Sequence, residues 1–341
     1  MTFQELYDNM QRKLAGIIPE IEMKYKAEMV YAINRLKKEK NAVILGHNYM
    51  EPSLYHFVCD IRGDSLELSR EAALTQSDII VFCGVRFMAE TAKILNPEKT
   101  VLLPSEKAGC SLAAGITAED VRRLKAQFPN APVVSYVNTY ADVKAESDIC
   151  CTSSNAVKVV QSLDSDLIIF IPDEYLARNI AKETGKKIVF PRIDNGSSGD
   201  NFQMIGWQGR CEVHEKFSVE DILNVRKQFS DVAVLAHPEC SPAVIAASDF
   251  SGSTAAMIQY VAQTKAARYL LLTECSMGDN IATTNKEKEM VRLCSVRCSH
   301  MNQITLENTL TALEKEQFVI EVPEDVRIKA VRSVERMLAV G

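Results

Sequence analysis

Residues 42–72 read AVILGHNYMEPSLYHFVCDIRGDSLELSREA, and this stretch decides the fold because its pattern occurs three times. The second copy is PVVSYVNTYADVKAESDICCTSSNAVKVVQS at 132–162, and the third is VAVLAHPECSPAVIAASDFSGSTAAMIQYVA at 232–262. Each copy begins with a short apolar run of strand length and ends in the pattern of a helix. Three similar segments in one chain predict three similar structural units.

A second apolar run follows each copy, again with a helical pattern behind it. These runs begin with SDIIVFCG at residue 77, SDLIIFIP at residue 165 and ARYLLLTE at residue 267. Alternation of strands and helices is typical of parallel sheets that are covered by helices. We therefore predict an α/β fold of three similar αβα sandwich domains, with parallel sheets arranged around a pseudo-threefold axis.

The predicted domain borders follow from these repeats. Residues 1–40 carry apolar residues at helical spacing with a break at Pro19, so they are expected to form an N-terminal helical extension of two helices. The other predicted domains are 41–104 plus 312–341 for the first, 105–195 for the second and 196–311 for the third.

The composition is ordinary for a soluble globular protein, with 47% hydrophobic and 25% charged residues in 341. A formal net charge of −6 argues against a nucleic-acid partner, which needs a basic surface. No apolar run approaches the ~18 residues of a membrane span, and the polar N-terminus lacks the apolar region of a signal peptide. We therefore expect a cytoplasmic protein with no membrane partner.

Polar residues stand where the first strand of each copy ends. The three triplets are His47-Asn48-Tyr49, Tyr136-Val137-Asn138 and His237-Pro238-Glu239. In parallel α/β sheets, ligands bind beyond the carboxyl ends of the strands. We therefore predict that these side chains face one common site.

Small polar residues gather at a matched distance after each triplet, just before a helical pattern. These clusters are Gly63-Asp64-Ser65, Thr152-Ser153-Ser154 and Gly252-Ser253-Thr254. Such residues serve either as plain N-caps or as an anion site, because the free N–H groups and the dipole of a helix start attract negative charge. Their matched spacing favours a shared anionic site.

Cysteine is abundant, with ten residues, and structural disulfides are not expected in a reducing compartment. Most of these cysteines fit the role of small buried hydrophobes. Cys110, Cys211 and Cys298 stand instead on polar or glycine-rich segments, one for each copy of the repeat. Three converging thiolates would leave one ligand position of a metal centre free, although the spacing matches neither paired zinc ligands nor a ferredoxin run.

From about residue 30 onward the chain resembles the quinolinate synthase family over nearly its whole length. Segments that carry the resemblance include GHNYM (46–50), VLLPSEKAGCSLA (101–113), WQGRCEVH (207–214), AHPECSPAVIAASDFSGST (236–254) and TECSMGDN (273–280). The fold of that family is three αβα domains around a pseudo-threefold axis. The resemblance therefore implies the same architecture as the repeats.

The resemblance also implies a 4Fe-4S cluster that is held by three cysteines and keeps one iron open. Residue-by-residue matching assigns the ligands to Cys110 in AGCSLA, Cys211 in WQGRC and Cys298 in CSHMNQIT. The last motif departs from family members with cysteines at C-x2-C-x2-C spacing, because three residues separate Cys294 from Cys298 here. Cys294 therefore remains an alternative ligand.

The reaction implied by the resemblance condenses iminoaspartate with dihydroxyacetone phosphate to quinolinate, releasing phosphate and water, in NAD biosynthesis. The sequence leaves open whether an aspartate oxidase or dehydrogenase supplies the iminoaspartate. Tyr49 would be the leading acid/base, and Glu239 would act as a base together with His237. The implied substrate-binding residues are His47, Ser65, Tyr136, Asn138, Ser153, His214, His237, Glu239 and Thr254, with Ser253 as the alternative to Thr254.

Two other functions are compatible with the same residues. An iron–sulfur hydro-lyase acting on another hydroxy acid would use the same open iron, and an assay for quinolinate separates it from the synthase. An iron–sulfur redox sensor usually carries a nucleic-acid-binding element and a basic face, and the charge of −6 disfavours it.

Overall fold

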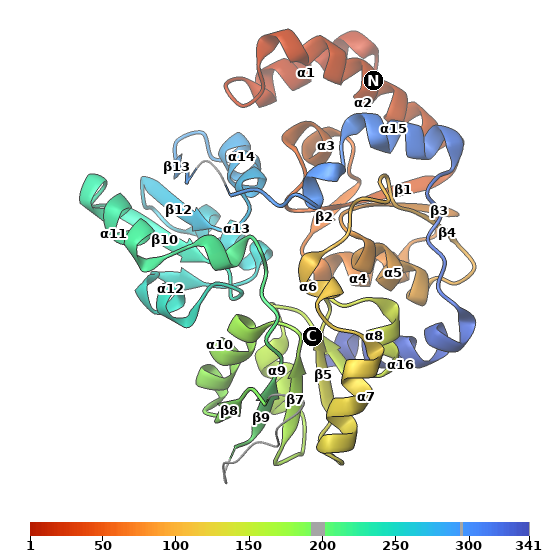
Figure 1. Ribbon diagram of the computed structural model, residues 1–341. Coiled ribbons are helices and arrows are strands. Elements are labelled where there is room, and N and C mark those ends of the chain that lie inside the picture. Colours follow the sequence, from red (N-terminus) through yellow and green to blue (C-terminus); the bar gives the residue numbers. More distant parts are fainter. Residues whose placement is uncertain (192–201, 294–295, 341) are drawn as a thin grey trace.

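The computed structural model describes residues 1–191, 202–293 and 296–340. It contains three parallel sheets, each covered by helices, and Figure 1 shows them as three lobes around a common centre. The α/β class and the three αβα units that the repeats predicted are confirmed. We call these lobes the first, second and third unit.

The first unit holds a sheet with the strand order β2-β1-β3-β4. Every residue of β3 is buried, as expected for a central parallel strand that is covered on both faces. The elements of this unit are β1 (Ala42–His47), α3 (Pro52–Phe57), β2 (Ile61–Gly63), α4 (Ser65–Leu74), β3 (Ile79–Cys83), α5 (Arg86–Leu95) and β4 (Thr100–Leu102).

The second unit holds a sheet with the order β6-β5-β7-β9-β8, so the strand that comes earlier in the chain, β8, lies outside β9 at the edge. Its helices are α6 (Ser111–Ala114), α7 (Ala118–Gln127), α8 (Ala141–Ala145), α9 (Ala156–Gln161) and α10 (Glu174–Thr184). Its strands are β5 (Val133–Tyr136), β6 (Ile149–Cys151), β7 (Ile168–Ile171), β8 (Ile188–Val189) and β9 (Met204–Gly206).

The third unit repeats the order of the first, as β11-β10-β12-β13. Its helices are η1 (His214–Lys216), α11 (Val219–Gln228), α12 (Pro242–Ala247), α13 (Thr254–Gln263) and α14 (Cys275–Thr284). Its strands are β10 (Val232–Ala236), β11 (Phe250–Ser251), β12 (Arg268–Leu272) and β13 (Glu289–Val291). The edge strands β2, β6 and β11 were not predicted, because two or three residues are too short to show a periodic pattern.

Helices before and after the three units complete the molecule. At the N-terminus, α1 (Phe3–Leu14) packs on α2 (Glu20–Glu39), and α2 covers β1. After the third unit come η2 (Met301–Gln303), α15 (Leu306–Lys315), which packs on α2, and α16 (Glu324–Val340). The last helix lies against α8 and β6 of the second unit and also against α5 of the first (Figure 1). The predicted domain borders stay predictions.

The apolar core is not divided equally among the units. One continuous cluster joins the first two units and includes Ile80 of β3, Val134 of β5 and Val334 of α16. The third sheet separates two clusters of its own, with Val234 on one face and Leu235 on the other, because successive strand residues point to opposite faces.

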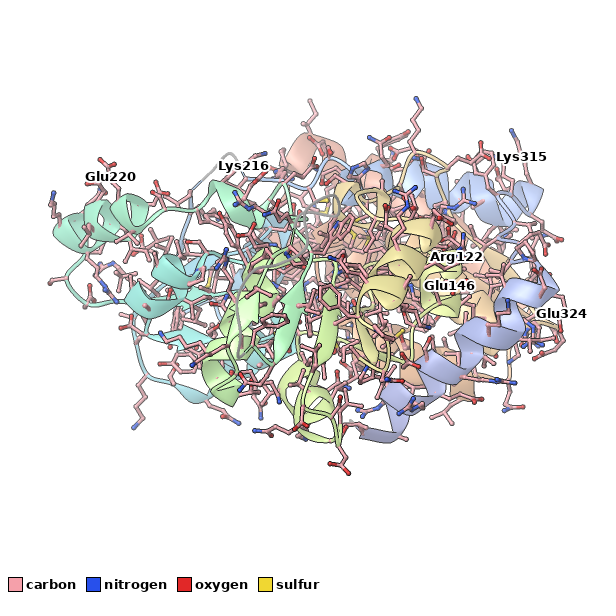
Figure 2. All side chains as sticks on the ribbon, turned by 60° about the horizontal axis from the view of Figure 1, so that its bottom comes forward. Arg122, Glu146, Lys216, Glu220, Lys315 and Glu324 are labelled. Atoms are coloured by element: carbon pink, nitrogen blue, oxygen red, sulfur yellow. The ribbon has the colours of Figure 1, made fainter. Side chains whose placement is uncertain are left out.

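Charged side chains of both signs lie on the outside of the molecule (Figure 2). On the second unit Arg122 donates to Glu146 at 2.9 Å. Other exposed charges are Lys216, Glu220, Lys315 and Glu324. Among the helices of the described ranges, none combines the length and the apolar character that a membrane span needs.

Candidate active site

The carboxyl ends of the three sheets meet around one cavity, in which about 650 Å³ of space lies between the atoms. All the residues that were predicted for the site line it, namely His47, Tyr49, Ser65, Cys110, Tyr136, Asn138, Ser153, Cys211, His214, His237, Glu239, Thr254 and Cys298. Their chemical roles stay predictions.

A chain of hydrogen bonds crosses all three units at this cavity. The hydroxyl of Tyr49 lies 2.5 Å from Oγ1 of Thr273, which lies 3.0 Å from Nε2 of His214. Nδ1 of His214 lies 2.6 Å from Oε2 of Glu239, and Oε1 of Glu239 accepts from the amide of Asn138 at 3.1 Å. We call these five residues the Tyr49–Asn138 chain.

The proton positions in the chain follow from what each group can donate. A carboxylate only accepts, so Nδ1 of His214 carries the proton in the contact with Glu239. In the tautomer in which Nε2 of His214 carries no proton, Nε2 accepts from the hydroxyl of Thr273, which in turn accepts from the hydroxyl of Tyr49. In this tautomer each donor from Tyr49 to Glu239 points in the same direction.

The two ends of this path favour opposite charge states. Burial raises the pKa of the Glu239 carboxyl, but the charge and hydrogen bond of His214, together with His237 and Tyr136, outweigh it and hold the pKa below its usual value. Burial raises the pKa of the Tyr49 hydroxyl well above its ordinary value. At neutral pH the chain holds a proton at Tyr49 and a negative charge at Glu239.

Two buried histidines flank the chain in equivalent positions of the repeat. Nδ1 of His47 accepts from the backbone N–H of Tyr49 at 3.3 Å, and Nδ1 of His237 accepts from that of Glu239 at 3.4 Å. Burial lowers the pKa of His47 to about 4 and, together with the charge of His214, that of His237 to about 3. Both rings are therefore neutral at pH 7, and Nε2 is left as the donor of each.

The small polar residues occupy three positions that differ in detail. Ser65 is the first residue of α4, whereas α9 begins only at Ala156, so Ser153 lies in a turn before the helix. In the third unit Ser253 caps α13 by accepting from Ala256, and Thr254 lines the cavity, where its hydroxyl accepts from Asn48 at 2.9 Å.

Each of the three predicted ligand cysteines comes after the strand of its sheet that lies last in the sequence. Cys110 comes after β4, Cys211 after β9 and Cys298 after β13. We call them the cysteine trio. Gly209 makes the approach of the Cys211 loop to β7 possible, because an added Cβ would lie 2.5 Å from the carbonyl oxygen of Pro172.

The cysteine trio shares one local turn. Backbone N–H groups two and three residues after each sulfur lower the pKa of its thiol, and at Cys298 the N–H of Met301 donates to the sulfur at 3.5 Å. Such pairs of N–H groups stabilise a thiolate. Burial nevertheless raises the pKa of all three thiols, that of Cys110 to about 12.

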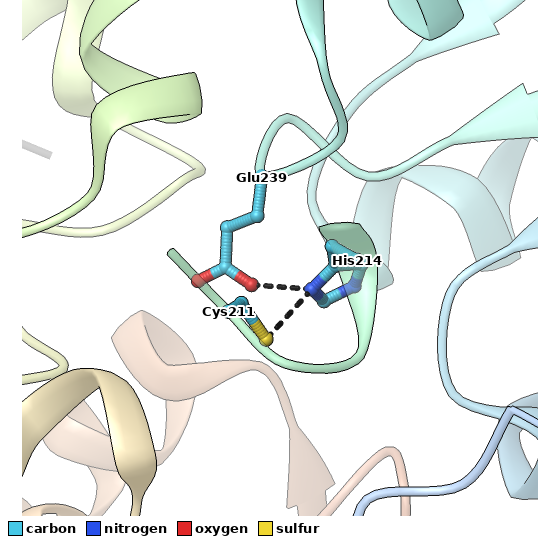
Figure 3. A group of neighbouring side chains, drawn as sticks. All are labelled: Cys211, His214 and Glu239. Carbon is cyan, nitrogen blue, oxygen red and sulfur yellow. Dashed lines mark hydrogen bonds and ion pairs between the residues drawn. The ribbon is translucent and has the colours of Figure 1, made fainter. Parts of the chain in front are cut away.

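Metal ligands of two kinds therefore meet at this cavity. Cys211, His214 and Glu239 have ligand atoms within 4.8 Å of one another (Figure 3). However, the 2.6 Å between His214 and Glu239 is a hydrogen-bond distance, with a proton where an ion would bind. The cysteine trio offers soft sulfur ligands with matching turns, a donor set that suits iron–sulfur and zinc centres. Cys294, the alternative ligand, lies outside the described residues.

Thr273 is the residue of this site that the sequence analysis missed. It directly follows β12, and its hydroxyl joins Tyr49 to His214. The signal that could have found it is its place at the carboxyl end of a central strand, where the other site residues were sought.

Comparison with known proteins places these residues in a family. A family model described as Quinolinate synthetase A protein matches residues 31–339. The chain belongs to this family. The matched range contains the whole Tyr49–Asn138 chain and the cysteine trio.

Curated relatives extend this similarity to almost full length. Quinolinate synthase 1 of Mesorhizobium japonicum is 51% identical over 335 residues, covering 98% of this chain and 97% of the relative. Quinolinate synthase of Xylella fastidiosa is 53% identical over 311 residues, covering 91% and 87%. The protein of that name from Agrobacterium fabrum is 50% identical over 335 residues, covering 98% and 91%.

Proposed function

We propose that this protein is a quinolinate synthase of NAD biosynthesis that condenses iminoaspartate with dihydroxyacetone phosphate. Phosphate and water leave, and the overall reaction balances without any change in oxidation state. It therefore needs acid–base catalysis and polarisation of oxygen atoms rather than electron transfer.

The observation that carries this proposal is that an ordered proton path and three similar thiols line the same cavity. The path runs from Tyr49 through Thr273 and His214 to Glu239. The family and the names of its relatives agree with this chemistry. A redox sensor has no need for such a path.

Substrate binding is assigned to donors on all three units. Both substrates are anionic, with two carboxylates on iminoaspartate and a phosphate on the triose. The neutral rings of His47 and His237 can donate from Nε2 without a counter-charge. The hydroxyls of Ser65, Ser153 and Thr254 provide further donors at the cavity wall.

Proton transfer is assigned to the Tyr49–Asn138 chain. Tyr49 gives its proton to a leaving oxygen of the condensed intermediate, and Glu239 accepts a proton from the carbon that becomes part of the ring. His214 and Thr273 join the two ends. The return of a proton from Glu239 to Tyr49 uses the reversed set of hydrogen bonds, in which Nε2 of His214 carries the proton and the hydroxyl of Thr273 donates to Tyr49. Asn138 holds Glu239 by its second oxygen.

Cys110, Cys211 and Cys298 would hold a 4Fe-4S cluster, since their sulfurs share one turn and one cavity. When bound by three cysteines, such a cluster supplies an iron without a protein ligand, which polarises a substrate oxygen as a Lewis acid. The imine substrate requires an enzyme that oxidises aspartate, and an aspartate oxidase or dehydrogenase would have this role.

The proposal is tested with protein purified without oxygen. We expect brown protein with absorbance near 400 nm, about four iron and four sulfide per chain, and quinolinate from the two substrates. Loss of iron in air should abolish turnover in parallel. Full activity in iron-free protein would overturn the role of the cluster, and iron-replete protein that makes no quinolinate would overturn the reaction.

A further inference from the structure

A buried amide of the third unit holds the backbone on both sides of Tyr49. Asn280 of α14 is 3% exposed, and its Nδ2 donates to the carbonyl oxygens of Asn48 at 3.1 Å and Met50 at 2.8 Å. These two carbonyls belong to the residues directly before and after Tyr49. The amide therefore fixes the peptide that precedes Tyr49 and the peptide that follows Met50, and so holds the short segment that carries the Tyr49 side chain.

The second unit makes the same contact to the third. Nδ2 of Asn179 on α10 donates to the carbonyl oxygens of Pro238 at 2.8 Å and Cys240 at 2.9 Å, which flank Glu239. Asn179 and Asn280 occupy equivalent places in the repeat, since each lies six positions after the acidic N-cap of its helix.

The remaining strand-end residue, Asn138, is held in the same way by a different donor. Nζ of Lys144, which is fully buried in α8, donates to the carbonyl oxygens of Val137 and Thr139 on either side of it. Tyr49, Asn138 and Glu239 are the third residues of the three repeated triplets. Each of the three residues thus has its own side-chain donor, which bonds to the carbonyl oxygens of the residues before and after it.

We propose that Asn280, Asn179 and Lys144 are positioning residues that set the geometry of Tyr49, Glu239 and Asn138. Backbone carbonyls are strong acceptors, and in a buried loop each of them needs a hydrogen-bond donor. One side chain that donates to two carbonyls therefore fixes the conformation of the residue between them. Catalytic groups need placement within about 0.5 Å, and an error near 1 Å can cost about 10²-fold in rate.

The placement of the two asparagines adds a second consequence. Asn280 reaches Tyr49 from another unit, and Asn179 reaches Glu239 from another unit, so two of the three loops take their final shape only when the units are docked. The effect on turnover rests on the proposed function, whereas the effect on loop order does not.

The chain offers a matched control for a merely structural role. Asn96 is also 3% exposed, and its Nδ2 also bridges two carbonyl oxygens, those of Ala72 at 2.9 Å and Ala92 at 3.0 Å. These carbonyls lie on α4 and α5 and flank no residue of the cavity. Loss of the Asn96 amide therefore removes as many hydrogen bonds, at the same exposed fraction, as loss of the Asn280 amide.

The test compares Asn280→Leu, Asn179→Leu and Asn96→Leu. We expect a similar loss of thermal stability in Asn280→Leu and Asn96→Leu. Only the Asn280 and Asn179 variants should lose about 10²-fold in kcat, with iron content retained and KM changed much less. Amide hydrogen exchange in the metal-free proteins should accelerate at 47–51 for Asn280→Leu and at 237–241 for Asn179→Leu, but at neither loop for Asn96→Leu.

Equal kcat losses in all three variants, or unchanged exchange at both loops, would overturn the proposal. Asn179 is only half-buried, so its variant decides the question if Asn280→Leu does not fold. If the wild-type protein makes no quinolinate, the proposed function fails, and the exchange measurement still decides whether these amides order the loops.

Discussion

The Tyr49–Asn138 chain and the cysteine trio face the same cavity but differ in what they need from a ligand. In the chain, each proton has an acceptor in a neighbouring side chain, so the path is complete within the protein. In the trio, burial raises the pKa of the thiols although backbone N–H groups near each sulfur lower it. The acid–base part is thus formed by folding, whereas the thiolate part needs a cation to drive deprotonation.

The largest effect should come from the cysteine trio. Cys110→Ala, Cys211→Ala and Cys298→Ala should each lose most bound iron and all activity, because two thiolates do not hold a cubane that is designed for three. Iron analysis and an anaerobic assay measure this. Cys275→Ala, at a half-buried thiol outside the cavity, is the control and should keep both.

Cys211 differs from the other two cysteines because it also contacts the Tyr49–Asn138 chain. Its sulfur lies 3.2 Å from Nδ1 of His214, so it touches both regions. If Cys110→Ala, which lacks a thiol of the trio but leaves the contact of Cys211 with His214, stayed brown and active, the assignment of the trio as iron ligands would be wrong. Cys294→Ala should also retain iron and activity, and the assignment of Cys298 is wrong if Cys294→Ala is colourless.

The next largest effect should come from Tyr49→Phe, which removes one hydroxyl and leaves the ring. The rate should fall by about 10²–10⁴-fold, the usual contribution of a positioned acid or base, with little change in KM. Tyr269→Phe removes a hydroxyl from another buried tyrosine, one that bonds to Thr264, and should leave turnover intact. A Tyr49→Phe enzyme with normal kcat and raised KM would make Tyr49 a binding residue.

A smaller effect is expected at the middle of the proton path. Thr273→Val keeps the shape of the side chain and removes the hydroxyl that joins Tyr49 to His214. We expect kcat to fall about 10-fold, which corresponds to roughly 1.4 kcal/mol, because both hydrogen bonds of this hydroxyl are lost, while iron content stays unchanged. Thr273→Ser should restore most of the rate. If Val and Ser variants turn over equally, protons do not pass through residue 273.

The smallest effect concerns acid stability. The pKa of His237 falls from 6.5 to about 3 on folding, and that of His47 falls to about 4. Between these values and 6.5 the unfolded chain binds more protons than the folded one, so the free energy of unfolding falls as the pH is lowered.

Each fully buried histidine contributes a slope of up to about 1.4 kcal/mol per pH unit over that range. His237→Gln should therefore flatten the pH dependence of urea unfolding of the metal-free protein. A wild-type protein whose stability does not change between about pH 6.5 and pH 4 would mean that these rings are not buried as neutral groups.

The sequence predicted the site residues where the same motif occurs in all three repeats of the chain. Three strand-end triplets at matched positions predicted that Tyr49, Asn138 and Glu239 meet, and the cavity contains all of them. Cys110, Cys211 and Cys298 stood out among ten cysteines because they lie on polar or glycine-rich segments, one for each copy of the repeat. The family resemblance then assigned them to a 4Fe-4S cluster, which their spacing alone did not.

What the sequence did not reveal depends on contacts between units. Asn280 and Tyr49 are separated by more than two hundred residues, and nothing in the helical pattern around Asn280 indicates that its amide reaches another unit's loop. Thr273 reads as the end of an apolar strand, and its role appears only when Tyr49 approaches from the first unit. Lys144 reads as an exposed charge on a short helix but is fully buried.

The last helix also completes contacts of the second unit late in synthesis. Ser333 of α16 donates to the carbonyl oxygen of Lys144 at 2.9 Å, and the amide of Asn155 donates to the carbonyl oxygen of Met337 at 3.2 Å. On the ribosome the second unit emerges long before residues 324–340, so it must wait with this face uncovered while the third unit is made. The backbone of Lys144, whose side chain holds the loop of Asn138, thus gains its contact with Ser333 only after α16 has been translated.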